Sequence, residues 1–304
     1  MNMGIIAASR LRSSLEPNIN LFGNLSGNNK WFGGVLAPNG KIYGIPFNST
    51  QILEIDPVNQ TTSLFGSLSG SVKWFGGVLA PNGKIYGIPF NSTQILEIDP
   101  VNQTTSLFGS LIGSLKWAGG VLAPNGKIYG IPHNSTQILE IDPVNQTTTL
   151  FGNLSGNNKW FGGVLAPNGK IYGMPRDSNQ ILEIDPVNQT TSLFGSLIER
   201  DNWAGGVLAP NGKIYGMPRD SNQILEIDPV NQTTTLFGNL IGNNKWFGGV
   251  LAPNGKIYGM PRDSNQILEI SQINIPDFIG SDADIPSSLL NLATSNYNQY
   301  YNKL

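Results

Sequence analysis

Six tryptophans divide most of this chain of 304 residues into equal parts, because each stands 43 residues after the one before. They are Trp31, Trp74, Trp117, Trp160, Trp203 and Trp246. The sequence from Trp31 to Leu68 recurs letter for letter from Trp74 to Leu111. A period of about 40–45 residues that holds four short strands is typical of a β-propeller blade. The repeat therefore predicts an all-β protein, a six-bladed β-propeller with four antiparallel strands in each blade.

One repeat shows where its four strands lie. The apolar run Phe32–Ala37 is expected beside the central channel, where a strand is buried on both faces. Lys41–Ile45 and Gln51–Asp56 follow as the second and third strands, and a proline stops each of them. Thr61–Leu68 is expected to be the outermost strand. Pro-Asn-Gly and Asp-Pro-Val-Asn between these runs predict tight turns.

The strand count predicts how the ring closes. The outer strand also occurs six times, but its first copy, Leu21–Leu25, precedes the first tryptophan. The last repeat ends near Ile270 with only three strands. We expect Leu21–Leu25 to pair with Gln266–Ile270 as the missing fourth strand, which removes an open sheet edge. The propeller then spans residues 21–270.

Two extensions flank the propeller, at residues 1–20 and 271–304. Leucines and tyrosines recur at intervals of three and four residues near the end of the chain, which predicts a short amphipathic helix at 287–303. Such a helix must bury its apolar stripe on the ring or on a second copy. We expect the contact within one chain and a monomeric protein, because the tether keeps the local concentration high.

The repeat resembles a known blade type. Its pattern G-V-x-x-x-P-N-G-x-I-Y, followed by N-S-x-x-I-L-x-I-D-P, is similar to the NHL repeat and related YVTN-type blades over residues 21–270. This resemblance implies a six-bladed propeller. It leaves the function open, because NHL-like propellers include protein-binding and RNA-binding modules, an acidic sensor group and a few lyases. The opening Trp-Phe-Gly-Gly is not a usual NHL feature.

Composition narrows the partners. The chain carries 18 basic and 20 acidic side chains, so it lacks the basic excess on which nucleic-acid and membrane-surface binding usually depends. It has no cysteine, which excludes disulfides and thiolate metal sites. No apolar run is long enough for a signal peptide or a membrane span. We expect a soluble protein whose compartment the sequence leaves unknown.

Differences between near-identical repeats point to one face of the ring. The loops from second to third strand, and from fourth strand to the next blade, share a side that we call the top face. The residue after the proline that ends the second strand varies most among the repeats; it is Phe47, Phe90, His133, Arg176, Arg219 and Arg262 in turn. A lysine before five of the six tryptophans adds to a basic excess on this face. These six residues and the six tryptophans are the candidate ligand-binding set.

Each candidate has an alternative structural role. The arginines either attract an anionic ligand or form local ion pairs with the aspartate that follows. The tryptophans either stack on a ligand or fill the space between blades. Phe32, Phe75, Phe161 and Phe247 alternate with alanine at the equivalent position, which favours partly exposed rings at the channel mouth. Glu54 and its equivalents either face solvent or neutralise the nearby lysine.

No constellation in the sequence indicates catalysis, a metal site or a cofactor. His133 is the single histidine, so it cannot build a multi-histidine zinc site. The favoured function is a non-catalytic binding or scaffold module that recognises a glycan, an anionic small molecule or a protein on its top face. One alternative is a propeller enzyme of the lyase or hydrolase type. Another is a recently amplified or engineered ring with no evolved ligand, which near-identical blades would fit.

Overall fold

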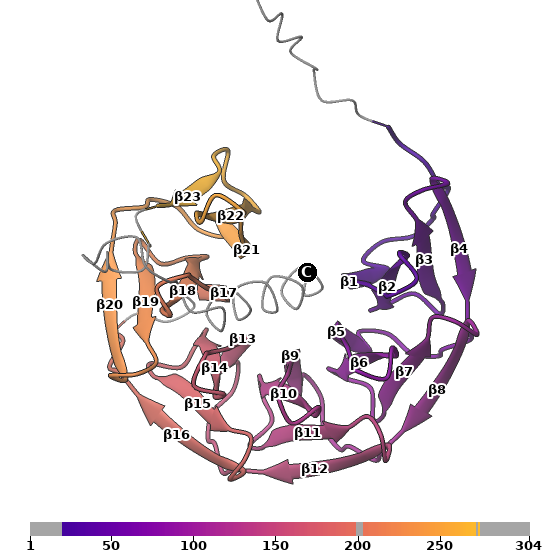
Figure 1. Cartoon of the computed structure of the whole chain (residues 1–304), viewed down its shortest axis with the longest axis horizontal. Coiled ribbons are helices and arrows are strands. Elements are labelled where there is room, and N and C mark those ends of the chain that lie inside the picture. Colours follow the sequence, from indigo (N-terminus) through magenta and orange to yellow (C-terminus); the bar gives the residue numbers. More distant parts are fainter. Residues whose placement is uncertain (1–19, 199–202, 272, 274–304) are drawn as a thin grey trace, which may run out of the picture.

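The computed structural model describes residues 20–198, 203–271 and 273, and these form an all-β, six-bladed propeller around a central channel (Figure 1). The predicted fold class is confirmed. The helix predicted at 287–303 and most of both predicted extensions lie outside the described residues. Among the described residues there is no helix with the length and apolarity that crossing a bilayer requires.

Each blade is an antiparallel sheet whose strands follow one another from the channel to the rim. Blade one contains β1 (Trp31–Leu36), β2 (Ile42–Pro46), β3 (Ile52–Asp56) and β4 (Thr61–Phe65). Blade two contains β5 (Trp74–Leu79), β6 (Ile85–Pro89), β7 (Ile95–Asp99) and β8 (Thr104–Phe108). Blade three contains β9 (Trp117–Leu122), β10 (Ile128–Pro132), β11 (Ile138–Asp142) and β12 (Thr147–Phe151). The predicted strands are therefore all present in these blades.

The remaining strands repeat the same bounds. Blade four contains β13 (Trp160–Leu165), β14 (Ile171–Pro175), β15 (Ile181–Asp185) and β16 (Thr190–Phe194). Blade five contains β17 (Trp203–Leu208), β18 (Ile214–Pro218), β19 (Ile224–Asp228) and β20 (Thr233–Phe237). Blade six contains β21 (Trp246–Leu251), β22 (Ile257–Pro261) and β23 (Leu268–Ile270).

The Gly-Gly pair that follows each tryptophan and its neighbour lets the blades approach closely. Gly76 has a φ of 77°, which favours glycine, and the register of β5 against β6 shifts between Trp74 and Gly77. A Cβ atom on Gly77 would lie 2.5 Å from the Ile45 side chain of the preceding blade. Both glycines are therefore needed, one for backbone conformation and one for contact between blades.

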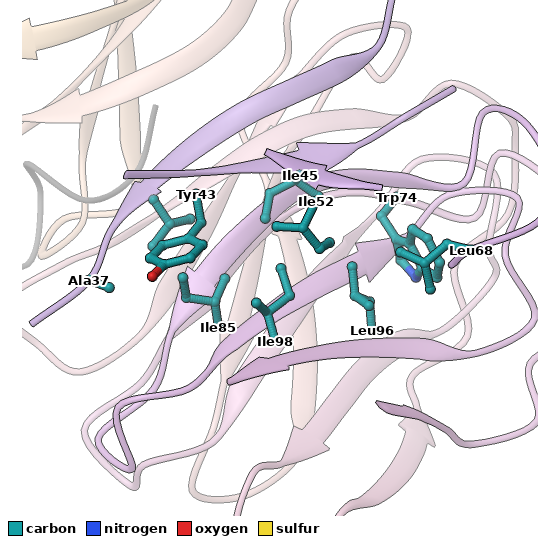
Figure 2. Close-up of a cluster of buried hydrophobic side chains, with 10 residues drawn as sticks. Ala37, Tyr43, Ile45, Ile52, Leu68, Trp74, Ile85, Leu96 and Ile98 are labelled. Atoms are coloured by element: carbon teal, nitrogen blue, oxygen red, sulfur yellow. The ribbon is translucent and has the colours of Figure 1, made fainter. Parts of the chain in front are cut away.

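The hydrophobic core lies between blades. The cluster at the first junction joins Tyr43 and Ile45 of blade one to Trp74, Ile85 and Leu96 of blade two, and all five are buried (Figure 2). Four further clusters repeat this arrangement around the ring. The apolar surface of each blade is therefore covered by the next blade.

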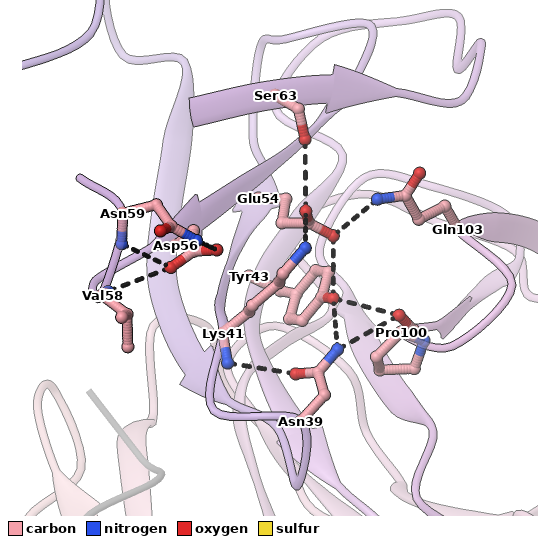
Figure 3. Close-up of polar contacts among 10 residues, drawn as sticks. All are labelled: Asn39, Lys41, Tyr43, Glu54, Asp56, Val58, Asn59, Ser63, Pro100 and Gln103. Atoms are coloured by element: carbon pink, nitrogen blue, oxygen red, sulfur yellow. Dashed lines mark hydrogen bonds and ion pairs between the residues drawn. The ribbon is translucent and has the colours of Figure 1, made fainter. Parts of the chain in front are cut away.

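A buried carboxylate also connects neighbouring blades. Glu54 accepts hydrogen bonds from Lys41 (2.6 Å), the Tyr43 hydroxyl (2.9 Å) and Gln103 of blade two (3.0 Å) (Figure 3). The prediction that this glutamate neutralises the nearby lysine is confirmed, and the alternative that it faces solvent is wrong. At Glu97, burial by itself raises the pKa, but hydrogen bonds from Lys84, Gln146 and Tyr86 outweigh burial, so the pKa lies below its ordinary value.

The structure corrects the predicted closure of the ring. Blade six has three strands, and residues 20–25 form no strand with β23 (Figure 1). These residues remain beside blade one, where the Asn20 side chain donates to Gln60 at 2.7 Å. Gln60 is the equivalent of Gln103, which elsewhere bonds the glutamate of the preceding blade. The rim is therefore open between blades six and one.

We expect Glu97→Gln to lower the free energy of unfolding by about 1–3 kcal/mol, because Lys84 and the hydroxyl of Tyr86 would lose a buried charged acceptor. The matched control is Glu269→Gln, since the side chain of Glu269 is 41% exposed whereas that of Glu97 is 5% exposed. The control should change stability by less than about 0.5 kcal/mol. Urea denaturation followed by circular dichroism measures both, and equal losses would contradict the role of burial.

The same carboxylates make stability depend on pH. The pKa values of Glu54, Glu97, Glu140 and Glu183 lie below the ordinary value for glutamate, so the folded state binds fewer protons than the unfolded state. Their contribution is complete above about pH 5 and is lost as the pH falls through the lowered pKa values. We expect the melting temperature to fall steadily below about pH 4. A melting temperature that rises on acidification would contradict this assignment.

Candidate functional site

At four of the junctions the lysine before the tryptophan is buried and joins two blades. The ammonium group of Lys73 donates to the carbonyls of Ser49 (2.7 Å), Gly70 (2.9 Å) and Phe47 (3.3 Å), and it lies 5.8 Å from the Trp74 ring centroid. The equivalent buried lysines are Lys116, Lys159 and Lys245. Burial lowers the pKa of Lys116 and Lys159 to about 8. The prediction that these four lysines contribute exposed positive charge to the top face is therefore wrong.

The tryptophans also belong to the junctions between blades. The indole N–H of Trp74 donates to the carbonyl of Gln94 at 2.9 Å, and the other five indoles make the equivalent bond. Five indoles are buried, at Trp74, Trp117, Trp160, Trp203 and Trp246. Trp31 is half-buried because blade six does not cover it. Burial leaves the five no exposed ring face for a ligand, so the structure supports the packing role and corrects the stacking role.

Four phenylalanines meet in the channel. Ring centroids are 3.8 Å apart for Phe32 and Phe75, 4.9 Å for Phe75 and Phe161, and 5.1 Å for Phe161 and Phe247. All four side chains are half-buried. The alanines that replace phenylalanine, at positions 118 and 204, are buried. The alternation thus indicates partly exposed rings at the channel mouth, as predicted, and we call this set the channel phenylalanines.

Three of the candidate loop residues pack on this aromatic surface. Phe47 lies 5.9 Å from Phe32 and 6.1 Å from Phe75, measured between ring centroids. Phe90 lies 5.3 Å from Phe75, and its other aromatic neighbours are Phe47 at 6.4 Å and His133 at 5.4 Å. His133 in turn lies 6.2 Å from Phe161. The loops of blades one to three therefore converge on the channel.

Arg176 continues this row into blade four. Its Nη1 lies 2.8 Å from Nε2 of His133. Burial, and next the charge of Arg176, lowers the pKa of His133 to about 4, so the imidazole is neutral at pH 7. Since a guanidinium can only donate, Nε2 is the acceptor and Nδ1 carries the ring proton. We call Phe47, Phe90, His133 and Arg176 the mouth arc.

The other two arginines are placed differently. The Nε of Arg219 donates to the Asn244 side chain at 3.0 Å, and its neighbour Asp220 lies 3.6 Å away. Arg262 is exposed and lies 3.8 Å from Asp263. Both fit the predicted alternative of a local ion pair with the aspartate that follows, and so does Arg176, whose Nε lies 4.0 Å from Asp177.

The candidate ligand-binding set predicted from the sequence did not include the channel phenylalanines. Their alternation with alanine was the sequence feature that could have identified them. That set also omitted a hollow of about 360 Å³ on the opposite face, between blades two and three, lined by Asn82, Asn125, Lys127, Asp142 and Val144. No signal marked this hollow, because the turns that form it are the same in other blades. Within the described ranges, no group of three histidine, aspartate or glutamate side chains could hold a metal ion.

Fold and site together define a six-bladed β-propeller with an aromatic channel mouth that ends at the buried His133 and the half-buried Arg176. A family model described as a repeat of unknown function, DUF6923, matches residues 118–295. This is more than half of the chain, which therefore belongs to the DUF6923 family. No curated protein matches the chain. The resemblance to the NHL repeat stays a prediction.

Solved structures share the fold at low sequence identity. Virginiamycin B lyase from Staphylococcus aureus has a TM-score of 0.70 at 15% identity, over 83% of this chain and 86% of the lyase. Hydrazine synthase from Kuenenia stuttgartiensis has a TM-score of 0.62 at 14% identity, over 93% of this chain and 89% of that one. An auxiliary nutrient binding protein from Bacteroides ovatus has a TM-score of 0.57 at 14% identity, over 80% of this chain and 69% of that one. At such low sequence identities, these similarities show a shared fold and do not show a shared function.

We expect Trp117→Phe to lower the free energy of unfolding by about 2–4 kcal/mol, because it leaves a cavity and removes the donor to the Gln137 carbonyl. Trp31→Phe is the matched control, since Trp31 makes the same bond to Gln51 but is only half-buried. Its loss should be smaller. Urea denaturation of both variants measures the difference, and an equal loss would show that burial by the preceding blade contributes nothing.

Proposed function

We propose that this propeller is a non-catalytic binding module that recognises its ligand at the channel mouth, through Phe47 and Arg176 of the mouth arc and the channel phenylalanines. Phe90 and His133 are buried and support these side chains by packing and hydrogen bonding. One observation carries the proposal. The residue after each second strand differs among otherwise near-identical blades, and four of these six residues line one side of the channel. Substitutions that only preserve the fold are not expected to cluster at one side of the channel.

The chemistry of the mouth indicates the kind of ligand. The half-buried rings of Phe32, Phe75 and Phe161 offer an apolar surface for an aromatic or aliphatic group. Arg176 lies at the edge of that surface and can donate two parallel hydrogen bonds to a carboxylate, sulfonate or phosphate. We therefore propose a small anionic molecule with an apolar body. Among the partners expected from the sequence, this favours an anionic small molecule over a neutral glycan.

The enzyme alternative has the lyase fold in its favour. A lyase or hydrolase needs a general acid or base within reach of the ligand. His133 is the titratable group of the mouth arc besides Arg176, and its Nε2 already accepts from that arginine. Catalysis by His133 would require its hydrogen bond to Arg176 to break, whereas binding requires no such change.

The test is a thermal-shift panel of aromatic carboxylates, aromatic sulfonates and neutral oligosaccharides. We expect aromatic anions to raise the melting temperature of the wild type and to bind Arg176→Gln at least about tenfold more weakly, a loss near 1.4 kcal/mol. Arg262→Gln is the matched control, because Arg262 is exposed and paired locally, and it should bind within about twofold of wild type.

Two outcomes would count against this function. Equal binding by the wild type and Arg176→Gln would exclude an anion site at the mouth arc. Conversion of a panel compound, followed by chromatography over hours, would favour the enzyme alternative instead.

A further inference from the structure

Two loops on the top face hold an apolar residue in a backbone conformation that is unfavourable for it. Val72 has a φ of 54° and Leu115 has a φ of 50°, so both lie in the left-handed region. In this region the Cβ atom crowds the following carbonyl oxygen, and a β-branched or bulky side chain is rarely found there. Both residues therefore strain the loops that lead from a fourth strand to the next blade.

The repeat shows which residue suits this position. The equivalent residue is asparagine or aspartate in the four other repeats, as Asn29, Asn158, Asp201 and Asn244. Asn158 and Asn244 have φ values of 51° and 49°, so they share the left-handed conformation. Asparagine adopts it readily because its short polar side chain can bond to the local backbone. Valine and leucine thus replace a residue that fits the same loop with less strain.

Packing does not explain the two exceptions. Val72 and Leu115 are half-buried, as Asn158 and Asn244 are. Neither apolar side chain belongs to the five core clusters of the described residues, although these clusters include half-buried side chains such as Leu79. Burial of apolar surface in the folded chain therefore does not account for the strain.

Strain elsewhere in the ring has a structural reason. Four glutamines with a φ of 52° each donate to the glutamate of the preceding blade; they are Gln103, Gln146, Gln189 and Gln232. There the strained backbone places a polar group where a junction between blades needs it. Valine and leucine have no such group. Strain that the fold does not explain is typical of residues that contact a ligand.

The first of these strained residues lies directly beside the mouth arc. The N–H of Val72 donates to the side chain of Asn48 at 2.9 Å, and its carbonyl accepts from the backbone N–H of Asn91 at 3.2 Å. Asn48 directly follows Phe47, and Asn91 directly follows Phe90. Val72 is therefore fixed between the loops that carry these two phenylalanines.

Leu115 is held in the same way one blade further along. Its N–H donates to the side chain of Asn91 at 2.8 Å, and its carbonyl accepts from the backbone N–H of Asn134 at 3.0 Å. Asn134 directly follows His133, the residue that lies against Arg176. The two strained residues thus occupy successive loops on one side of the channel.

This row of loops changes polarity with distance from Arg176. Asn158 lies in the loop nearest to Arg176, since its carbonyl accepts from the backbone N–H of Asp177 at 3.0 Å. Leu115 lies one loop further from the guanidinium, and Val72 lies two loops further. A polar position near the charged group and two apolar positions beyond it match a molecule with an ionic head and an apolar chain.

We infer that Leu115 and Val72 bind the apolar chain of the ligand, and that this ligand is a straight-chain alkyl carboxylate. The inference rests on the function proposed above and adds the shape of the ligand. The carboxylate bonds Arg176, the first carbons lie on the channel phenylalanines, and the chain passes over Leu115 and then Val72. Two apolar residues in successive loops favour a chain over a compact ring system, because a chain can reach both.

A series of carboxylates tests this contact, with hexanoate, octanoate and decanoate titrated into the protein by isothermal calorimetry. Burial of one methylene group improves affinity about threefold to fourfold, so each pair of added carbons should tighten binding to the wild type by at least about tenfold. In the double variant Val72→Asn with Leu115→Asn, this gain should fall below about threefold.

The matched control is Ile241→Asn. Ile241 is an apolar side chain that is 87% exposed, on the loop before blade six and outside this row. The control should keep the full gain of the wild type with chain length.

Stability supplies a second measurement that does not depend on a ligand. Release of the backbone strain should raise the melting temperature by about 2–4 °C for Val72→Asn and for Leu115→Asn. Higher stability together with weaker recognition of the chain is the result expected of residues that are kept for binding.

Two results would overturn the inference. One is a double variant that keeps the gain with chain length. The other is a lower melting temperature in the asparagine variants, which would show that Val72 and Leu115 stabilise the fold by packing. In either case the proposed function stands if Arg176→Gln still weakens the binding of hexanoate. If no carboxylate of the series binds the wild type, the proposed function itself fails.

Discussion

The propeller depends on the lysine ammonium group that four of its junctions bury beside a tryptophan. In the second blade this group is Lys73, whose hydrogen bonds reach the preceding blade at Phe47 and Ser49 and its own loop at Gly70. A buried charge is tolerated only when its donors are satisfied, so the three carbonyls must stay in place. The loop that carries the variable residue is thereby fixed on the channel side. The geometry of the candidate site follows from this bond, because Phe47 supplies one of its acceptors.

Much of the fold could be predicted from the sequence, because turn chemistry and strand patterns repeat six times with little change. The roles of charged residues could not. Lys73 looks like a surface cation in sequence, but its position beside three carbonyls depends on two blades meeting in space. Glu54 also follows a strand pattern that faces solvent in many sheets, yet its partners include Gln103 of the next blade. The burial of Lys73 and that of Glu54 both depend on contacts between blades, and the sequence of a single repeat does not reveal such contacts.

The candidate site shows the same division. Variation at His133 and Arg176 marked the correct loops, because differences among near-identical blades are visible in one sequence. That Arg176 reaches His133 as well as its own Asp177, whereas Arg219 reaches Asn244 and Arg262 lies beside Asp263, depends on side-chain directions that no spacing rule gives. Residues 20–25 are a further case. Strand counting predicted their pairing with β23, but the repeat does not show that Asn20 bonds Gln60 of blade one instead.

The channel phenylalanines have a consequence for how many blades this architecture admits. The surfaces between blades are nearly identical, so every junction imposes nearly the same angle between neighbours. The axis adds a second constraint, because its free cross-section grows with each added blade. Phe75 and its three counterparts fill that cross-section, with alanine at positions 118 and 204 leaving them room. A ring with fewer blades would crowd these side chains, and a wider ring would separate them. Packing at the axis thus favours six blades together with the junctions between them.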